Sequence, residues 1–326
     1  MKVTLNEEAK SLLQDLLETM DQNIDDADYY NQILSEGYLV DKESTVLPIA
    51  ELKAEDYFNN PYLKNIRPSE IRIGKWSLEN DKYIPNQPFS YDVIETTSDD
   101  GYIEHTKFGY FTRKFKYLAI KENKTTWMSI TPHEINTMKG SIDEAYGDVL
   151  VLGLGLGYYP YMVSLKENVK TIDVVEIAKE PTDIFKKNIL PLFKEKDKIH
   201  IIQGDAFDYL NNNSKHYDYV FVDLWHLPED GLPLYTKAKS LEKAGSTYSY
   251  WIESDMLILL RRAMLILLEE KQNNKEATFA KGNDLTEDLL FEIDKATQEI
   301  QVTHPEQIMD LIHNNYLSNL AKNLVL

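Results

Sequence analysis

Residues 148–157 read DVLVLGLGLG, an apolar run that passes directly into three glycines at alternate positions. The apolar part is typical of a strand that is buried on both faces of a parallel sheet. Gly153, Gly155 and Gly157 then leave the backbone bare at a tight turn, where a ligand can lie against the main chain without meeting a side chain. The pattern therefore predicts a strand, a ligand-binding turn and a helix.

The alternation of strands and helices continues beyond this turn. Four further short apolar runs are separated by helix-length segments: TIDVVEI (171–177), KIHIIQ (198–203), YDYVFVD (217–223) and TYSYWIE (247–253). Such alternation predicts an α/β fold with a Rossmann-like, doubly wound and mostly parallel sheet. After residue 253 we recognise no final pair of strands, and the pattern is mostly helical.

Additions are expected on both sides of this unit. Residues 1–88 form an N-terminal helical and loop region, with helical patterns at 4–20, 26–39 and 48–59 and a proline-punctuated passage up to Pro88. Residues 89–147 form a β-hairpin region, with a turn at 121–124, and a linking helix that Thr131 and Glu134 open as a capping box. The Rossmann-like domain spans 148–271, and a C-terminal helical extension spans 272–326.

Acidic residues follow the ends of three predicted strands. Glu176 closes the second strand, Asp205 follows the third in the run GDAF, and Asp223 ends the fourth. The carboxyl ends of parallel strands meet at one edge of the sheet, which is where open α/β sheets bind ligands. A carboxylate about twenty residues after a glycine turn can accept hydrogen bonds from ribose hydroxyls. These acids predict a nucleoside site.

With these motifs, residues 148–223 resemble class I S-adenosylmethionine-dependent methyltransferases, and within them the spermidine-synthase-like branch. The resemblance implies S-adenosylmethionine as cofactor, held by Gly153, Gly155 and Gly157, with Glu176 on the ribose. It also implies that Asp205 meets the adenine amino group and that the backbone amide of Ala206 meets the ring. An NAD site fits less well, because the loop lacks the G-x-G-x-x-G spacing.

Two positions depart from the aminopropyltransferases of that branch. Those enzymes are expected to hold an acid inside the glycine loop, where this chain has Leu156, and a second acid three residues after the catalytic one, where it has His226. We therefore expect a methyltransferase acting on a small molecule or a protein. An aminopropyltransferase and a non-catalytic protein that binds S-adenosylmethionine are the alternatives.

Catalytic groups are sought near the end of the fourth strand. Asp223 is the first candidate for a base that takes a proton from the acceptor, and His226 is the second because imidazole titrates near neutral pH. His226 is as easily explained as a surface histidine. Tyr158, Tyr159 and Trp225 either wall the site or, more commonly for aromatic residues, belong to the core.

Composition limits the compartments and partners that we expect for the protein. The 326 residues carry a net charge of −19 and no cysteine, and residues 256–268, the most apolar stretch, are interrupted by Arg261 and Arg262. We expect a cytoplasmic protein without membrane or nucleic-acid partners, because such a negative surface repels phosphate backbones. The seven histidines are scattered, so no metal site is predicted. A homodimer is compatible with the sequence.

Overall fold

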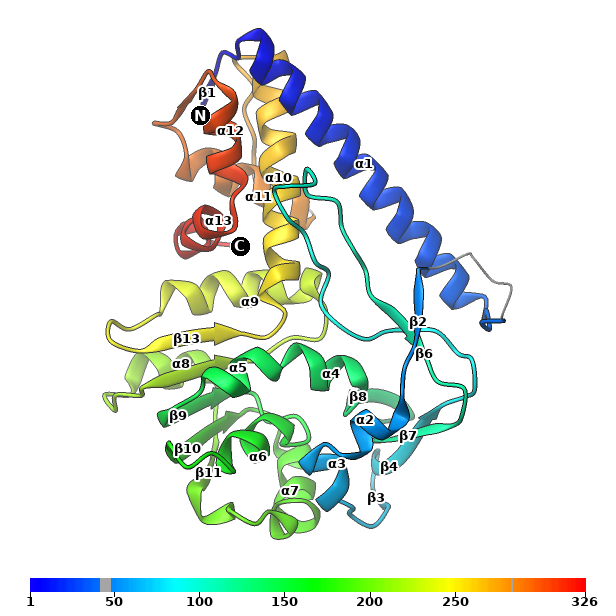
Figure 1. Cartoon of the computed structure of the whole chain (residues 1–326). Coiled ribbons are helices and arrows are strands. Elements are labelled where there is room, and N and C mark those ends of the chain that lie inside the picture. Colours follow the sequence, from blue (N-terminus) through cyan, green and yellow to red (C-terminus); the bar gives the residue numbers. More distant parts are fainter. Residues whose placement is uncertain (42–47, 283) are drawn as a thin grey trace.

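The predicted α/β unit forms one five-stranded parallel sheet in the computed structural model, which describes residues 1–41, 48–282 and 284–326 (Figure 1). The strand order is β11-β10-β9-β12-β13, and every neighbouring pair is parallel. The strands are β9 (Gly147–Leu152), β10 (Val169–Glu176), β11 (Ile199–Gln203), β12 (Tyr219–Val222) and β13 (Thr247–Tyr250). The predicted fold class is confirmed, including TYSYWIE as the fifth strand.

The order of strands reverses direction between β9 and β12. Right-handed crossovers therefore place α6 and α7 on one face of the sheet and α8 and α9 on the other. The bounds are α6 (Tyr158–Ser164), α7 (Lys179–Asn188), α8 (Ala206–Asn212) and α9 (Pro228–Ser240), with 3-10 turns at Leu190–Leu192 and Lys196–Lys198. The reversal opens a crevice at the carboxyl ends of β9 and β12, beside the glycine loop.

Burial explains why the strand sequences are so apolar. The four residues of β12 and the last four of β9 are each at most 1% exposed, since helices cover both faces. Burying one such side chain contributes roughly 1.5–3 kcal/mol. The sheet is thus the rigid support for whatever its strand ends carry.

A second β region lies beside the sheet (Figure 1). It holds a four-stranded antiparallel sheet, β3-β4-β7-β8, and a small sheet, β2-β6-β5. The strands are β2 (Ile49–Glu51), β3 (Ile71–Ile73), β4 (Trp76–Tyr83), β5 (Phe89–Ser90), β6 (Phe108–Tyr110), β7 (Phe115–Glu122) and β8 (Thr125–Ser129). The predicted hairpin turn is confirmed, with Asn123 and Lys124 both at positive φ, as a type I′ turn requires.

Three expectations for the N-terminal region were wrong. The patterns at 4–20 and 26–39 belong to one helix, α1 (Glu7–Ser35), because no helix-breaking residue separates them. The pattern at 48–59 begins with strand β2, and only α2 (Ala54–Phe58) is helical there, followed by α3 (Pro61–Asn65). The proline-punctuated passage contains β3 and β4, which pair with each other, and β4 also pairs with β7 over a long separation in sequence.

The linking helix is also divided. It consists of α4 (Pro132–Thr137) and α5 (Lys139–Glu144), with Met138 between them. Thr131 makes no side-chain capping hydrogen bond, so the predicted capping box was wrong. The Glu134 side chain is buried instead of turning back to the start of its helix.

Helices from both ends of the chain pack together around α10 (Glu253–Asn273), as Figure 1 shows. They are α1, α11 (Leu285–Ala296), α12 (Pro305–Ile312) and α13 (Asn314–Leu320), with a 3-10 turn at Ala321–Asn323 and a two-strand pairing of β1 (Lys2–Val3) with β14 (Gln301–Val302). Lys239 ties α9 to this end, since its Nζ contacts Ser318 Oγ at 2.9 Å and Glu253 Oε1 at 3.5 Å. No helix in the described ranges is long and apolar enough to cross a membrane.

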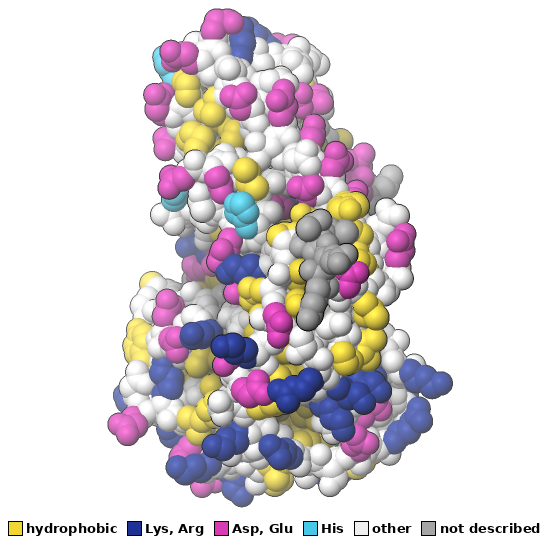
Figure 2. Space-filling view, turned by 45° about the vertical axis from the view of Figure 1, so that its right-hand side comes forward, with side chains coloured by type: hydrophobic (Ala, Val, Ile, Leu, Met, Phe, Trp, Pro, Cys, Tyr) yellow, Lys and Arg dark blue, Asp and Glu magenta, His cyan; other side chains and the backbone are white. Residues whose placement is uncertain are grey.

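Charge is unevenly spread over the molecule. On the face in Figure 2, acidic side chains are scattered over the upper part, and Lys and Arg gather over the lower part. The sequence of α1 agrees, with eight Asp and Glu against one Lys. The net charge therefore describes the α1 end of the molecule better than the end that carries the two β regions.

Candidate functional site

Two adjoining cavities lie at the carboxyl ends of β9, β10 and β12. The larger, of about 420 Å³, reaches from Gly153 and Gly155 to Asp223 and Trp251. The smaller, of about 200 Å³, reaches from Gly153 to Gly204 and Phe207. Both are lined by Gly153, Glu176, Ile177 and Leu224, so they form two lobes of one elongated site.

The first position of the glycine loop, Gly153, can hold only glycine. Gly153 has φ +98°, and a Cβ there would overlap the carbonyl oxygen of Asp223. Gly155 has φ +52° and faces Met128 of β8, whereas the missing Cβ of Gly157 faces Phe185, outside both lobes. Within the described residues, the amide of Gly155 makes no hydrogen bond, which leaves it free for a ligand.

Glu176 is fixed at the junction of the two lobes. Its Oε2 accepts a hydrogen bond from the amide of Leu154 at 3.0 Å, and its Oε1 accepts one from the amide of Ala178 at 2.7 Å. These bonds hold the carboxylate against the glycine loop. Each oxygen keeps a further acceptor site, so the group can still receive two ribose hydroxyls.

Asp205 and Ala206 line the smaller lobe, together with Phe207. Asp205 is the N-cap of α8, and its Oδ1 accepts from the amides of Phe207 at 2.8 Å and Asp208 at 2.9 Å. The cap orients the carboxylate and leaves Oδ2 without a partner among the described residues. A planar base entering this apolar lobe would meet a fixed acceptor there.

Asp223 lies at the end of β12 and lines the larger lobe. Burial, with the charge of Glu176 as the second cause, raises the pKa of Asp223 to about 7. A carboxyl with that pKa can take up a proton near neutral pH, which suits a general base. His226 is exposed at the mouth of the lobe, where its ring meets Trp127 edge-on with centroids 5.3 Å apart.

The aromatic residues divide between wall and core. Trp225 and Trp251 line the larger lobe, and the indole N–H of Trp225 donates to the carbonyl of Trp251 at 3.2 Å. Tyr159 stacks on Phe221 inside the core, at 3.8 Å between ring centroids. Tyr158 is buried, and its hydroxyl accepts from Asn60 at 2.8 Å.

The sequence left open whether the strands at 89–130 complete the sheet or cover the site, and it favoured a capping role for Glu134 over contact with a ligand. The hairpin strand β8 supplies a wall, through Thr126, Trp127, Met128 and Ser129, so the N-terminal β region closes the larger lobe. Glu134, which was expected to cap a helix, also lines this lobe with its carboxyl buried. A run of alternating residues next to a turn predicts a strand but not where that strand packs. An acid inside an apolar helix pattern, in contrast, indicates a candidate site residue.

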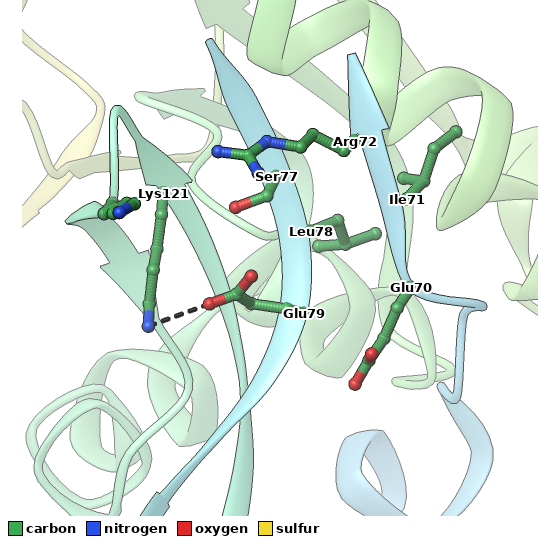
Figure 3. A pocket seen from close by; sticks show the side chains of 8 residues that line it. Glu70, Ile71, Arg72, Ser77, Leu78, Glu79 and Lys121 are labelled. Atoms are coloured by element: carbon green, nitrogen blue, oxygen red, sulfur yellow. Dashed lines mark ion pairs between the residues drawn. The ribbon is translucent and has the colours of Figure 1, made fainter. Parts of the chain in front are cut away.

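A further hollow, of about 550 Å³, lies away from this site. It is on the open face of β3, β4 and β7 and is lined by Glu70, Arg72, Ser77, Glu79 and Lys121, among others (Figure 3). Lys121 Nζ lies 2.9 Å from Glu79 and 2.7 Å from Asp81, so its charge is already neutralised. We regard this hollow as a solvated sheet face. The described residues contain no group of three or more His, Asp or Glu side chains that could hold a metal ion.

Comparison with known proteins agrees with the architecture. The fold and the site define a Rossmann-like α/β protein with a nucleoside-sized crevice. Residues 129–239 match the family model of the spermine/spermidine synthase domain, which confirms the resemblance to the spermidine-synthase-like branch over that segment. The match covers the linking helices, the glycine loop and strands β9 to β12. No curated protein matches the chain.

Similar solved structures include three methyltransferase-related chains. One is a candidate O-methyltransferase from Klebsiella pneumoniae, with 18% identity over 32% of this chain and 47% of that chain and a TM-score of 0.26. Another is the CcbJ methyltransferase from Streptomyces caelestis, with 18% identity over 35% of this chain and 49% of that chain and a TM-score of 0.27. The third is the Trypanosoma brucei PRMT1 enzyme–prozyme complex with AdoHcy, with 14% identity over 35% of this chain and 37% of that chain and a TM-score of 0.28. The chain spans less than half the length of each.

Proposed function

We propose that this protein is an S-adenosylmethionine-dependent methyltransferase. The observation that carries the proposal is the two-lobed crevice. The smaller lobe has the apolar walls and the Asp205 carboxylate that suit adenine, and Glu176 at the junction suits a ribose. The glycine loop and the larger lobe then suit the sulfonium and its amino-acid tail. In this proposal Gly153, Gly155, Glu176, Asp205 and Ala206 bind the cofactor, and Gly157 shapes the loop.

Methyl transfer also fits the residues around the reaction centre. The bound sulfonium supplies an activated methyl group, which leaves its sulfur for the acceptor's lone pair as the C–S bonding electrons return to sulfur. The protein has to hold donor and acceptor in line, which is worth up to roughly 7–11 kcal/mol in ideal cases. Asp223 accepts the acceptor's proton, and His226 is the second candidate for that role. We propose a small-molecule or protein acceptor and no nucleic acid.

An aminopropyltransferase is the second candidate. The spermine/spermidine synthase match favours it, and so does the charge of the larger lobe. Glu134, Glu176 and Asp223 line that lobe, and no Lys or Arg is among its described lining residues, which suits a cationic ligand. Against it, Leu156 is only 1% exposed and lies in the core, so the glycine loop offers no acid, and His226 stands where a second acid is expected.

Ligand-dependent stability separates these candidates. We expect S-adenosylmethionine and its demethylated product to raise the Tm, since a ligand at a hundred times its Kd stabilises the native state by about 2.7 kcal/mol. We expect decarboxylated S-adenosylmethionine to do so less well and NAD to have no effect. A larger shift with the decarboxylated form would favour aminopropyl transfer, and no shift with any adenosyl ligand would refute both candidates.

A further inference from the structure

Glu134 carries a buried carboxyl that the fold does not satisfy. The residue is 9% exposed, and its Oε2 has no hydrogen-bond partner among the described residues. Buried polar groups in native proteins are nearly always paired, because an unpaired one destabilises the folded state. Because Glu134 also lines the larger lobe, a ligand bound there is a candidate partner for its carboxyl.

The groups around Glu134 place it at the ligand's tail. It lines the larger lobe together with Gly155 and Asp223. Its carboxyl interacts electrostatically with Tyr158, directly after the glycine loop, whose pKa is raised to about 12 by burial, lowered in part by the hydrogen bond of Asn60 and raised further by Glu134. Tyr83 of β4 is the third titratable group that interacts with it. Burial, followed by the charge of Asp223, raises the pKa of Glu134 itself well above its usual range.

The glycine loop offers no carboxylate to the ammonium group of a donor's tail. Leu156 packs into the core, and its carbonyl accepts a hydrogen bond from the Tyr62 hydroxyl at 2.5 Å. The Glu176 carboxylate is already engaged by two backbone amides, at the junction with the smaller lobe. Asp223 is assigned to the acceptor's proton in the proposed function, so Glu134 on α4 is the carboxyl of this lobe that is left for an ammonium group reaching past Gly155.

We infer that Glu134 binds the ammonium group of the donor's amino-acid tail, from a helix outside the glycine loop. The inference rests on the proposed adenosyl site and holds for either transfer reaction, because both donors carry an amine on that tail. Burial favours the protonated form of Glu134, whereas a cation beside it favours the ionised form. Binding of the tail therefore releases a proton from the protein.

The test compares two ligands that differ in the tail. S-Adenosylhomocysteine carries the ammonium, whereas 5′-methylthioadenosine has the same adenosyl thioether without the amino-acid group. Calorimetric titration of the full chain with each ligand gives both affinities. We expect Glu134→Gln to weaken S-adenosylhomocysteine about tenfold or more, as for a lost charged hydrogen bond. We expect the affinity for 5′-methylthioadenosine to stay within about twofold.

Controls separate charge from structure. Asp143→Asn removes the same charge from an exposed position on α5 and should change neither affinity. Titration in buffers of different ionisation enthalpy should show proton release by the wild type with S-adenosylhomocysteine and much less with 5′-methylthioadenosine. Because Asp223 lines the same lobe with a pKa of about 7, the comparison is repeated in Asp223→Asn, where proton release with S-adenosylhomocysteine assigns the proton to Glu134 even if Glu134→Gln does not fold.

The results that would overturn the inference differ from the result that would refute the adenosyl site. Equal loss of affinity for both ligands in Glu134→Gln would make Glu134 a structural residue and overturn the inference. Unchanged affinity for S-adenosylhomocysteine would overturn it as well, and so would equal proton release with both ligands. Failure of the wild type to bind either ligand would instead refute the adenosyl site, and the inference with it.

Discussion

Asp223→Asn should make the protein more stable, and increasingly so as the pH rises. The substitution keeps the shape of the side chain and removes its charge. The pKa of Asp223 is raised from 3.8 to about 7 by burial and by Glu176. Because the ionised form is disfavoured only in the native state, the carboxyl destabilises the fold wherever the unfolded chain would have it charged.

The magnitude follows from the two pKa values. Below about pH 4 the carboxyl is protonated in both states and the cost vanishes. Between 3.8 and 7 the unfolded chain ionises while the native protein does not, so the cost grows with pH. Above pH 7 the destabilisation reaches about 4 kcal/mol, because each unit of difference between the two pKa values corresponds to 1.36 kcal/mol. Asp223 is half-buried at the wall of a cavity, where water screens its charge, so we expect about 2–4 kcal/mol.

Urea unfolding of the wild type and of Asp223→Asn at pH 4, 6 and 8 measures this difference. We expect about 0.5 kcal/mol or less at pH 4 and the full gain at pH 8. The exposed control Asp143→Asn should show a small effect that hardly varies with pH. A gain that is the same at every pH, or a wild type that is the more stable at pH 8, would refute the reasoning. In a turnover assay the same variant should be slower by about 10²–10⁴-fold, because it lacks the base.

Three further substitutions test the site and its surroundings. Asp205→Ala should weaken adenosyl binding and lower stability by about 1 kcal/mol through the lost cap, whereas Asp205→Asn should retain the cap; titration and urea unfolding measure both effects. Gly153→Ala should cost about 2 kcal/mol or more, because its Cβ meets the carbonyl of Asp223 at a positive φ; an unchanged Tm would contradict this. Lys124→Gly should raise stability by up to about 1 kcal/mol, because its φ is +74°; a lower Tm would count against the turn geometry.

The central sheet could be predicted because its signals are local. Each strand from 148 to 253 is a short apolar run, and a strand covered on both faces can have little else in it. Glu176, Asp205 and Asp223 could be placed on one edge because parallel strands end together. Strand β4 could not be recognised, because it pairs with β7 some forty residues further along the chain, and β3 in turn depends on β4 as its partner.

The sequence by itself determined the doubly wound, mostly parallel sheet, the bare glycine loop and the strand ends that carry the acids, because these follow from the period of the chain and from the alternation of strands and helices. Only the tertiary structure decided which groups are buried beside one another. It closed the larger lobe with β8, enclosed Glu134 without a partner and moved the pKa of Asp223 to about 7. Such electrostatic properties depend on how much water and which charges surround a group, and neighbours that are distant in the chain supply both.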